Sequence, residues 1–263
     1  MIDFHNHILP NTDDGSTSLE MSIDMLNNAA NQGITDVVNT VHYKHPKVEG
    51  HGISFNIINN RINKLQAEVN RKGIPIRLHL GSEVYYSADV LNLIDDPLAT
   101  MGNYKYMLIE FHPQIIPNNH REILFELKMR GVTPIIAHPE RYKKVQDDIN
   151  VVHSWLDAGC LIQVDGGSIM GYLGHKAKVA SEIIIKQNWC QVLGSDAHNN
   201  KNRNFLLKES LKVVESFIGD KSKMLVNENP KAIINGYKIV TSMIENRIEK
   251  VSTFWNKFNF TKK

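Results

Sequence analysis

Seven short apolar runs, separated by amphipathic stretches, limit the folds open to this 263-residue chain more than any other feature. The runs have the length of buried strands, which we predict over residues 1–4, 36–41, 76–81, 106–111, 133–137, 161–164 and 191–194. Between them, apolar residues recur at helical spacing over residues 19–32, 57–71, 121–130, 151–158 and 176–187. Strands that alternate with helices are typical of a parallel sheet, and seven such units in series predict a sheet closed or nearly closed into an α/β barrel.

Glycine residues follow several of the helical patterns. Gly33, Gly73, Gly131 and Gly159 stand where helix C-caps are expected, and a strand begins within a few residues of each. Two further helical patterns, over residues 205–217 and 230–250, complete the chain. Because no Pro-, Ser- or Gly-rich linker and no internal repeat divides the sequence, we expect one domain over residues 1–263, with C-terminal helices from about residue 204.

The charge of the chain is balanced overall but uneven along its length. The formal net charge is +2, whereas residues 201–263 carry 13 Lys/Arg against six Asp/Glu. This basic part is either a surface that attracts an acidic substrate or a membrane, or a set of solvated helix faces. We expect no nucleic-acid partner, and any membrane association would be peripheral.

The N-terminus and the cysteines predict the cellular compartment. MIDFHNHILP lacks the basic region and long apolar core of a signal peptide, and no apolar run reaches the ~20 residues of a membrane span. Cys160 and Cys190 each open an apolar run, as reduced cysteines of a buried core do. These features favour a cytoplasmic protein.

Residues of types that bind metals stand at or just after the ends of six of the seven predicted strands. These residues, after strands one to five and strand seven, are His5 with His7, His42, Glu83, Glu110, His138, and Asp196 with His198. In α/β barrels the catalytic groups gather at the carboxyl ends of the strands. The imidazoles of His5 and His7 point to the same side of an extended segment, so they can share one ion. Buried carboxylates such as Glu83 would be costly there without a compensating positive charge.

With Asp14 the candidate ligands number nine, which suits two or three ions that share a bridging carboxylate and a bridging hydroxide. Divalent ions ~3.5–4 Å apart hydrolyse phosphate esters, because they lower the pKa of bound water and neutralise the phosphoryl oxygens. Nitrogen and oxygen donors without a thiolate suit Mn, Fe or Zn better than Ca or Mg, and Mn is our first choice. Arg141 and Arg203 follow His138 and His198 closely enough to bind phosphate at the same place. The other seven histidines are expected not to be ligands, although His112 could compete for metal.

The spacing around the cysteines excludes a cysteine-based phosphatase. That mechanism needs an arginine six residues after the nucleophile, and the chain has Gly166 and Asp196 at those positions after Cys160 and Cys190. The sequence also has no serine nucleophile elbow and no P-loop. Metal-dependent hydrolysis is therefore the expected chemistry.

Six motifs between residue 2 and about residue 203 resemble those of a known family. In order they read FHNHILPNTDDG, TVHY, GSEV, LIEF, IIAHPERY and SDAHN. Together they resemble the PHP (polymerase and histidinol phosphatase) superfamily, and within it the bacterial protein-tyrosine phosphatases that accompany capsule and exopolysaccharide gene clusters. The resemblance implies a distorted (β/α)7 TIM-like barrel with a trinuclear metal site.

The resemblance also implies a role for each candidate residue. The first ion would be held by His5, His7, Glu83 and Asp196, the second by Glu83 as a bridge with Glu110 and His138, and the third by Asp14, His42 and His198. Arg141 and Arg203 would be the catalytic residues that bind phosphate, while a metal-bridging hydroxide attacks phosphorus. The implied substrate is phosphotyrosine on a tyrosine autokinase that regulates capsular or exopolysaccharide synthesis and export.

Two other functions stay open on the residues alone. A small-molecule phosphatase of the histidinol phosphatase type would need a general acid for its alkyl leaving group, and Asp165 could supply one. A metal-stabilised binding module without activity would use the basic tail, residues 251–263, to reach a partner. A phenol with a pKa of ~10 leaves with little protonic help, so the absence of an evident general acid favours phosphotyrosine. The oligomeric state and the native metal also stay open.

Overall fold

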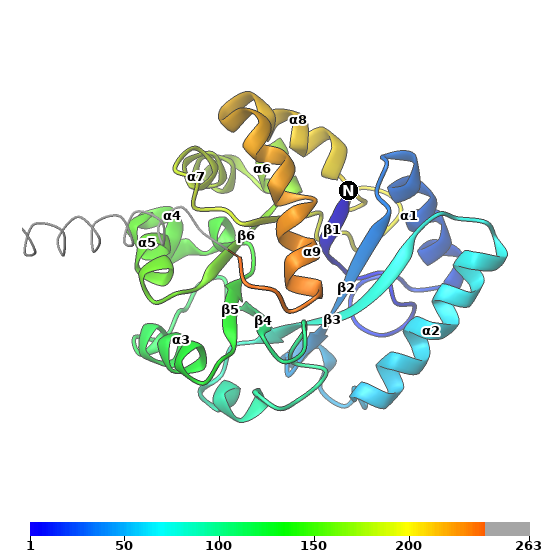
Figure 1. Cartoon of the computed structure of the whole chain (residues 1–263), viewed down its shortest axis with the longest axis horizontal. Helices are drawn as coiled ribbons and strands as arrows, with labels where there is room; N and C mark the ends of the chain where they lie inside the picture. Colours follow the sequence, from blue (N-terminus) through cyan, green and yellow to red (C-terminus); the bar gives the residue numbers. More distant parts are fainter. Residues whose placement is uncertain (240–263) are drawn as a thin grey trace, which may run out of the picture.

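Seven parallel strands form the centre of the computed structural model, which describes residues 1–239 (Figure 1). They are β1 (Ile2–Asn6), β2 (Asp36–Tyr43), β3 (Arg77–Tyr85), β4 (Tyr106–Glu110), β5 (Thr133–Ile136), β6 (Leu161–Asp165) and β7 (Val192–Gly194). Each strand pairs with the next along the chain. The Asp196 N–H donates to the His5 carbonyl at 2.7 Å and the His7 N–H to the Ala197 carbonyl at 2.8 Å, so the end of β7 meets β1. The predicted barrel is thus confirmed.

Helices surround this barrel and cover its outer face (Figure 1). The α-helices are α1 (Leu19–Asn31), α2 (Phe55–Arg71), α3 (His120–Met129), α4 (Lys143–Asp147), α5 (Asn150–Asp157), α6 (Gly166–Met170), α7 (His175–Lys186), α8 (Leu207–Ile218) and α9 (Glu228–Ile234). Four 3-10 helices are η1 (Pro46–Val48), η2 (Ala88–Leu93), η3 (Pro139–Arg141) and η4 (Gly219–Leu225). Within residues 1–239, no helix combines the length and apolarity that a membrane crossing requires.

Two helical segments differ from the sequence prediction. The connection from β3 to β4, for which no helical stretch was predicted, contains the 3-10 helix η2. The helical pattern over residues 230–250 gives a helix that ends at Ile234, because Gly236 takes a left-handed φ of 71°. The rest of that pattern from residue 240, and the basic tail over residues 251–263, lie outside the described residues.

Strand β4 shows how side-chain alternation separates core from site. Met107 and Ile109 point outward into the main core between barrel and helices. Tyr106 and Leu108 point into a second core cluster inside the barrel, to which Ile233 of α9 also belongs. Glu110, two residues beyond Leu108, shares their inward face. Apolar residues therefore fill one end of the barrel, and polar residues fill its carboxyl end.

Three strands run further than the apolar runs predicted. We expected His5, His42 and Glu83 to follow their strands, but each lies within its strand. The apolar signal stops where the inward side chains become polar, whereas the backbone ladder continues: His42 of β2 stands directly beside Glu83 of β3. The strand register itself therefore brings two candidate ligands together.

Candidate metal centre

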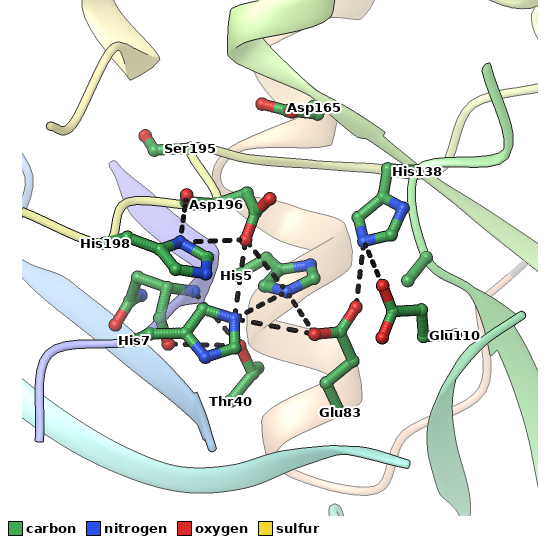
Figure 2. A network of polar contacts seen from close by, with 12 residues as sticks. His5, His7, Thr40, Glu83, Glu110, His138, Asp165, Ser195, Asp196 and His198 are labelled. Carbon is green, nitrogen blue, oxygen red and sulfur yellow. Dashed lines mark hydrogen bonds and ion pairs between the residues drawn. The ribbon is translucent and has the colours of Figure 1, made fainter. Parts of the chain in front are cut away.

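The nine predicted ligands gather at the carboxyl end of the barrel (Figure 2). Eight of them are buried, and Asp14 retains 35% side-chain exposure at the opening. Their ligand atoms form three groups, and a fourth group joins His42 and Glu110 to His45; within each group the atoms lie within 4.8 Å of one another. The residues come from six different strands or the loops that follow them, so no short segment of the chain could form this centre alone.

Four side chains converge on a first position between β1, β3 and β7. The Nε2 atoms of His5 and His7 are 3.3 Å apart, and each lies 3.3–3.5 Å from Glu83 Oε2. Asp196 Oδ1 lies 3.5 Å from His5 Nε2 and 3.4 Å from His7 Nε2. Ligands about 2.1 Å from a tetrahedral ion stand roughly 3.4 Å apart, so this set has the spacing of a metal site.

A second position adjoins the first on the β4 and β5 side. His138 Nε2 lies 2.8 Å from Glu83 Oε1 and 3.8 Å from Glu110 Oε1. Figure 2 shows His138 above both carboxylates, with Glu83 between His5 and His138. One oxygen of Glu83 faces the first position and the other faces the second, which is the geometry of a bridging carboxylate.

A third position lies at the opening of the barrel. Asp14 Oδ1 is 3.1 Å from His42 Nε2 and 3.4 Å from His198 Nε2. His7 also belongs to this group of ligand atoms. Lys47 reaches the other oxygen of Asp14 at 2.6 Å, and sequence reasoning did not identify this contact.

Neighbouring residues fix the orientation of three imidazoles. His5 donates its Nδ1–H to Gln163 Oε1 at 3.0 Å, and His198 donates to the Asp196 carbonyl at 2.8 Å. Asp13 Oδ2 lies 2.8 Å from His7 Nδ1 and also accepts the His42 backbone N–H at 3.0 Å. Each contact leaves Nε2 turned toward the centre, as oxygen partners do for metal-bound histidines.

Sequence reasoning missed Asp13 and Gln163. Asp13 stands beside Asp14 in the NTDDG segment, which was the one available signal. Gln163 lies within β6, 158 residues from the His5 imidazole that it orients, and nothing in its local sequence indicates that contact. His112, which we expected could compete for metal, is exposed in the loop after β4 and belongs to none of the ligand groups found in residues 1–239.

Electrostatics show that the cluster requires positive charge. Burial raises the pKa of Glu83, but the imidazoles of His5, His138 and His42 outweigh this and hold the pKa well below its usual range. Burial and the Glu83 charge raise the pKa of Glu110 to about 7. Burial and His7 act to lower the pKa of His42, yet Asp14 and Glu83 raise it to about 9. Without metal, protons on the imidazoles therefore balance the negative charge of the carboxylates, and a bound metal ion would take over that role.

Buried polar atoms without hydrogen bonds fit the same conclusion. Among residues 1–239, both ring nitrogens of His42 and Oε2 of Glu110 form no hydrogen bond, although carboxylate oxygens of Asp14 and Glu83 lie 3.1 and 3.2 Å from the two His42 nitrogens. An unpartnered buried polar atom costs about 1–3 kcal/mol, and a bound cation would remove that cost. Donor types, spacing and unpartnered atoms together fit divalent transition-metal ions.

The backbone at two candidate ligands is strained. His138 has a φ of 30° and Asp196 a φ of 45°, in the left-handed region that residues with a Cβ seldom adopt. Such conformations cluster at functional sites, where surrounding contacts hold them. Gly194 leaves room beside this turn, since a Cβ there would lie 2.5 Å from the Cβ of His5.

The two predicted arginines meet at one carboxylate oxygen. Arg141 Nη1 and Arg203 Nη2 both contact Asp196 Oδ2, the latter at 2.8 Å. Asp196 Oδ1 faces His5 and His7 instead. Asp165, at the end of β6, lies 3.8 Å from Arg141 and caps α6 by accepting the Gly167 N–H at 2.8 Å. The Asp196 carboxylate thus connects the cluster of candidate metal ligands to two guanidinium groups.

Comparisons with known proteins identify the family of this chain. The CpsB/CapC family of capsular polysaccharide synthesis matches residues 1–235. The tyrosine-protein phosphatase YwqE of Bacillus subtilis is 30% identical over 240 residues, which cover 91% of this chain and 93% of that protein. A solved structure from work on YwqE and on CpsB of Streptococcus pneumoniae, described as unique metal-dependent tyrosine phosphatases, matches with a TM-score of 0.85 and 28% identity, over 92% of this chain and 97% of the other.

A more distant structure shows only the shared fold. The histidinol phosphate phosphatase of Lactococcus lactis matches with a TM-score of 0.53 and 14% identity, over 84% of this chain and 93% of the other. The family match over residues 1–235 and the similarity to YwqE carry the assignment. This chain belongs to the CpsB/CapC family of capsular polysaccharide synthesis proteins.

Proposed function

We propose that this chain is a metal-dependent protein-tyrosine phosphatase of capsular or exopolysaccharide synthesis. The observation that carries the proposal is the double contact of Asp196. Its Oδ1 faces the imidazoles of the first metal position, while its Oδ2 binds Arg141 and Arg203. A phosphate bound by the two arginines would therefore lie against the metal cluster. The names of the relatives support the same activity.

The proposal assigns the nine clustered residues as ligands of two or three divalent ions, with Mn the first choice over Fe and Zn. The first ion is assigned to His5, His7, Glu83 and Asp196, the second to Glu83, Glu110 and His138, and the third to Asp14, His42 and His198. Three groups of converging ligand atoms support most of these assignments: His5, His7 and Asp196; His5, Glu83 and His138; and Asp14, His42 and His198 with His7. Glu110 converges with His42 and His45, and its assignment beside His138 rests on the 3.8 Å between Glu110 Oε1 and His138 Nε2. When bound, such ions lower the pKa of a water molecule and neutralise the phosphoryl oxygens.

The remaining roles belong to the protein itself. Arg141 and Arg203 bind the phosphoryl oxygens, because two N–H groups of one guanidinium can donate to two oxygens of the same phosphate. Asp196 orients both guanidinium groups before substrate arrives, which reduces the reorganisation needed in the transition state. Asp13 and Gln163 hold His7 and His5 in place.

The proposed substrate is phosphotyrosine in a flexible acidic segment, as on the tail of a tyrosine autokinase. Residues 201–263 carry a net positive charge, which would speed encounter with an acidic segment at low salt. The proposal also includes a cytoplasmic location and a single phosphatase domain over residues 1–263. Two buried free cysteines, Cys160 and Cys190, support that location.

The two alternative functions receive less support. Asp165 could serve as a general acid for an alkyl phosphate, but its Oδ1 is occupied by the Gly167 N–H and its Oδ2 faces Arg141. A non-enzymatic module has no need of two arginines directed at the cluster. YwqE and the solved structure at 28% identity are named as tyrosine phosphatases, whereas the histidinol phosphate phosphatase at 14% identity shows only the fold.

The test compares kcat/KM for a phosphotyrosine peptide, a phosphoserine peptide and histidinol phosphate, each with Mn, Fe or Zn. We expect the phosphotyrosine peptide to be preferred by at least about tenfold and the preference to weaken as salt rises. A tenfold preference for histidinol phosphate would replace the proposal by the small-molecule alternative. Tight metal binding without turnover of any substrate would support the binding module instead.

A further inference from the structure

His45 lies at the rim of the metal centre but differs from the nine candidate ligands. Its ring centroid is 4.6 Å from that of His42 and 4.6 Å from that of Tyr85. Its side chain is 11% exposed, and Nε2 is 3.5 Å from Glu110 Oε2. The spacing of His45, His42 and Glu110 would permit a metal ion. The protonation of the ring decides whether His45 is a ligand.

A backbone hydrogen bond fixes the tautomer of His45. The Lys47 N–H donates to His45 Nδ1 at 2.9 Å and caps the 3-10 helix η1. Nδ1 must therefore present a lone pair, and the single proton of the neutral imidazole resides on Nε2. His5 and His198 have the opposite arrangement, because their Nδ1–H groups donate to oxygen atoms and leave Nε2 free for a metal. His45 thus presents an N–H to the centre, where the ligands present lone pairs.

The Nε2–H of His45 forms no hydrogen bond within residues 1–239. The Glu110 oxygen that it faces lies at 3.5 Å, and that oxygen forms no hydrogen bond. A donor at this place faces the opening from the β2–β4 side of the barrel, whereas Arg141 and Arg203 approach from the loops after β5 and β7. A phosphate bound by the arginines would thus leave its ester oxygen open to a donor from the opposite wall.

We propose that His45 is a catalytic residue that donates its Nε2–H to the phenolic oxygen of the leaving tyrosine. This inference rests on the proposed phosphatase function. As the phosphorus–oxygen bond breaks, its electron pair moves onto the phenolic oxygen, and the hydrogen bond stabilises the negative charge that develops there. The proton stays on Nε2, because a neutral imidazole is far too weak an acid to transfer it. The phenolate then takes a proton from water.

Leaving-group acidity separates this role from the alternatives. His45→Ala should lower kcat/KM for a phosphotyrosine peptide on the order of a hundredfold, as expected when one donor to a developing charge is lost. The same variant should lower kcat/KM for nitrophenyl phosphate less than about threefold, because that phenol is more acidic and needs less stabilisation. His45→Gln places an amide N–H near the position of Nε2 and should recover part of the loss.

His112 provides a matched control. Its Nδ1 also accepts a backbone N–H two residues further on, from Gln114 at 3.2 Å, but the ring is exposed on the surface. His112→Ala should leave both substrates unaffected. Metal content of His45→Ala should equal that of the wild type, which separates a donor from a ligand. The melting temperature should fall by no more than the few degrees that loss of the η1 cap explains, and His45→Gln tests the donor role separately from the cap.

Three results would overturn the inference. An equal loss on both aryl phosphates would place His45 against the phosphoryl group or the fold rather than the leaving oxygen. Loss of bound metal in His45→Ala would make it a ligand. If the wild-type protein hydrolysed neither aryl phosphate, the proposed phosphatase function would be wrong, and His45 would have no leaving group to stabilise.

Discussion

Replacement of Arg141 by alanine should weaken transition-state binding without emptying the metal centre. The Arg141 guanidinium is three-quarters buried, contacts Asp196 and lies 3.8 Å from Asp165, so it is held in place before substrate binds. A pre-oriented charged donor to phosphoryl oxygens contributes about 2–4 kcal/mol to transition-state stabilisation. kcat/KM for a phosphotyrosine peptide should therefore fall roughly 30- to 1,000-fold.

The companion variants make this prediction specific. Arg141→Lys should recover only part of the loss, because an ammonium group cannot bind two oxygens in one plane. Arg203→Ala should cost less, about 1–2 kcal/mol, because that side chain is 37% exposed and contacts one carboxylate. Metal content, measured by elemental analysis, should stay at the wild-type level in all three variants. Activity of Arg141→Ala within twofold of wild type would refute the assigned role, and so would a loss of metal that accounts for the lost activity.

Three further predictions concern the surroundings of the centre. Asp13→Asn should lower metal affinity about 10- to 100-fold in a competition assay with a chelator, because Asp13 orients His7 and His42; unchanged affinity would contradict this. The metal-free protein should lose stability as the pH rises from about 6.5 to 9, because the pKa of His42 in the folded protein is raised to about 9. Protonated His42 contributes on the order of 3 kcal/mol to the free energy of unfolding. This contribution is fully present below the pKa of His42 in the unfolded chain and disappears as the pH rises past its pKa in the folded protein. Thermal melts should also show greater stabilisation by metal at pH 8.5 than at pH 6.5, and a melting temperature that rises with pH without metal would refute the reasoning. Iodoacetamide should leave activity intact, because Cys160 and Cys190 are buried and burial raises the pKa of each thiol; inactivation under native conditions would be unexpected.

The barrel could be predicted from sequence because each strand contains a short apolar run. The ends of β1, β2 and β3 could not, since the inward residues there are polar and resemble loop residues. His42 and Glu83 stay in the ladder because their side chains compensate one another's charge inside the barrel. That compensation is a tertiary effect and leaves no local hydrophobic signal.

The candidate ligands could be identified because histidine and carboxylate residues recur at the strand ends and because six motifs resemble one family. Of the residues that orient the candidate ligands, Asp13 lies in the first motif but is not a candidate ligand there, and Gln163 lies in no motif. Gln163 looks like an ordinary polar residue in an apolar strand, and its contact with His5 joins β6 to β1 across the barrel. The distinction between His45 and the candidate ligand histidines depends on one backbone N–H, that of Lys47. No residue pattern encodes which ring nitrogen carries the proton.

The central claim is that clustered metal ions and two arginines hydrolyse phosphotyrosine. The most direct test measures bound metal and phosphotyrosine phosphatase activity in the same samples, before chelation, after chelation and after addition of Mn, Fe or Zn. Two to three equivalents of metal should be bound, activity should vanish when they are removed, and it should return with a divalent transition ion. Full activity in protein shown to be free of metal would contradict the account.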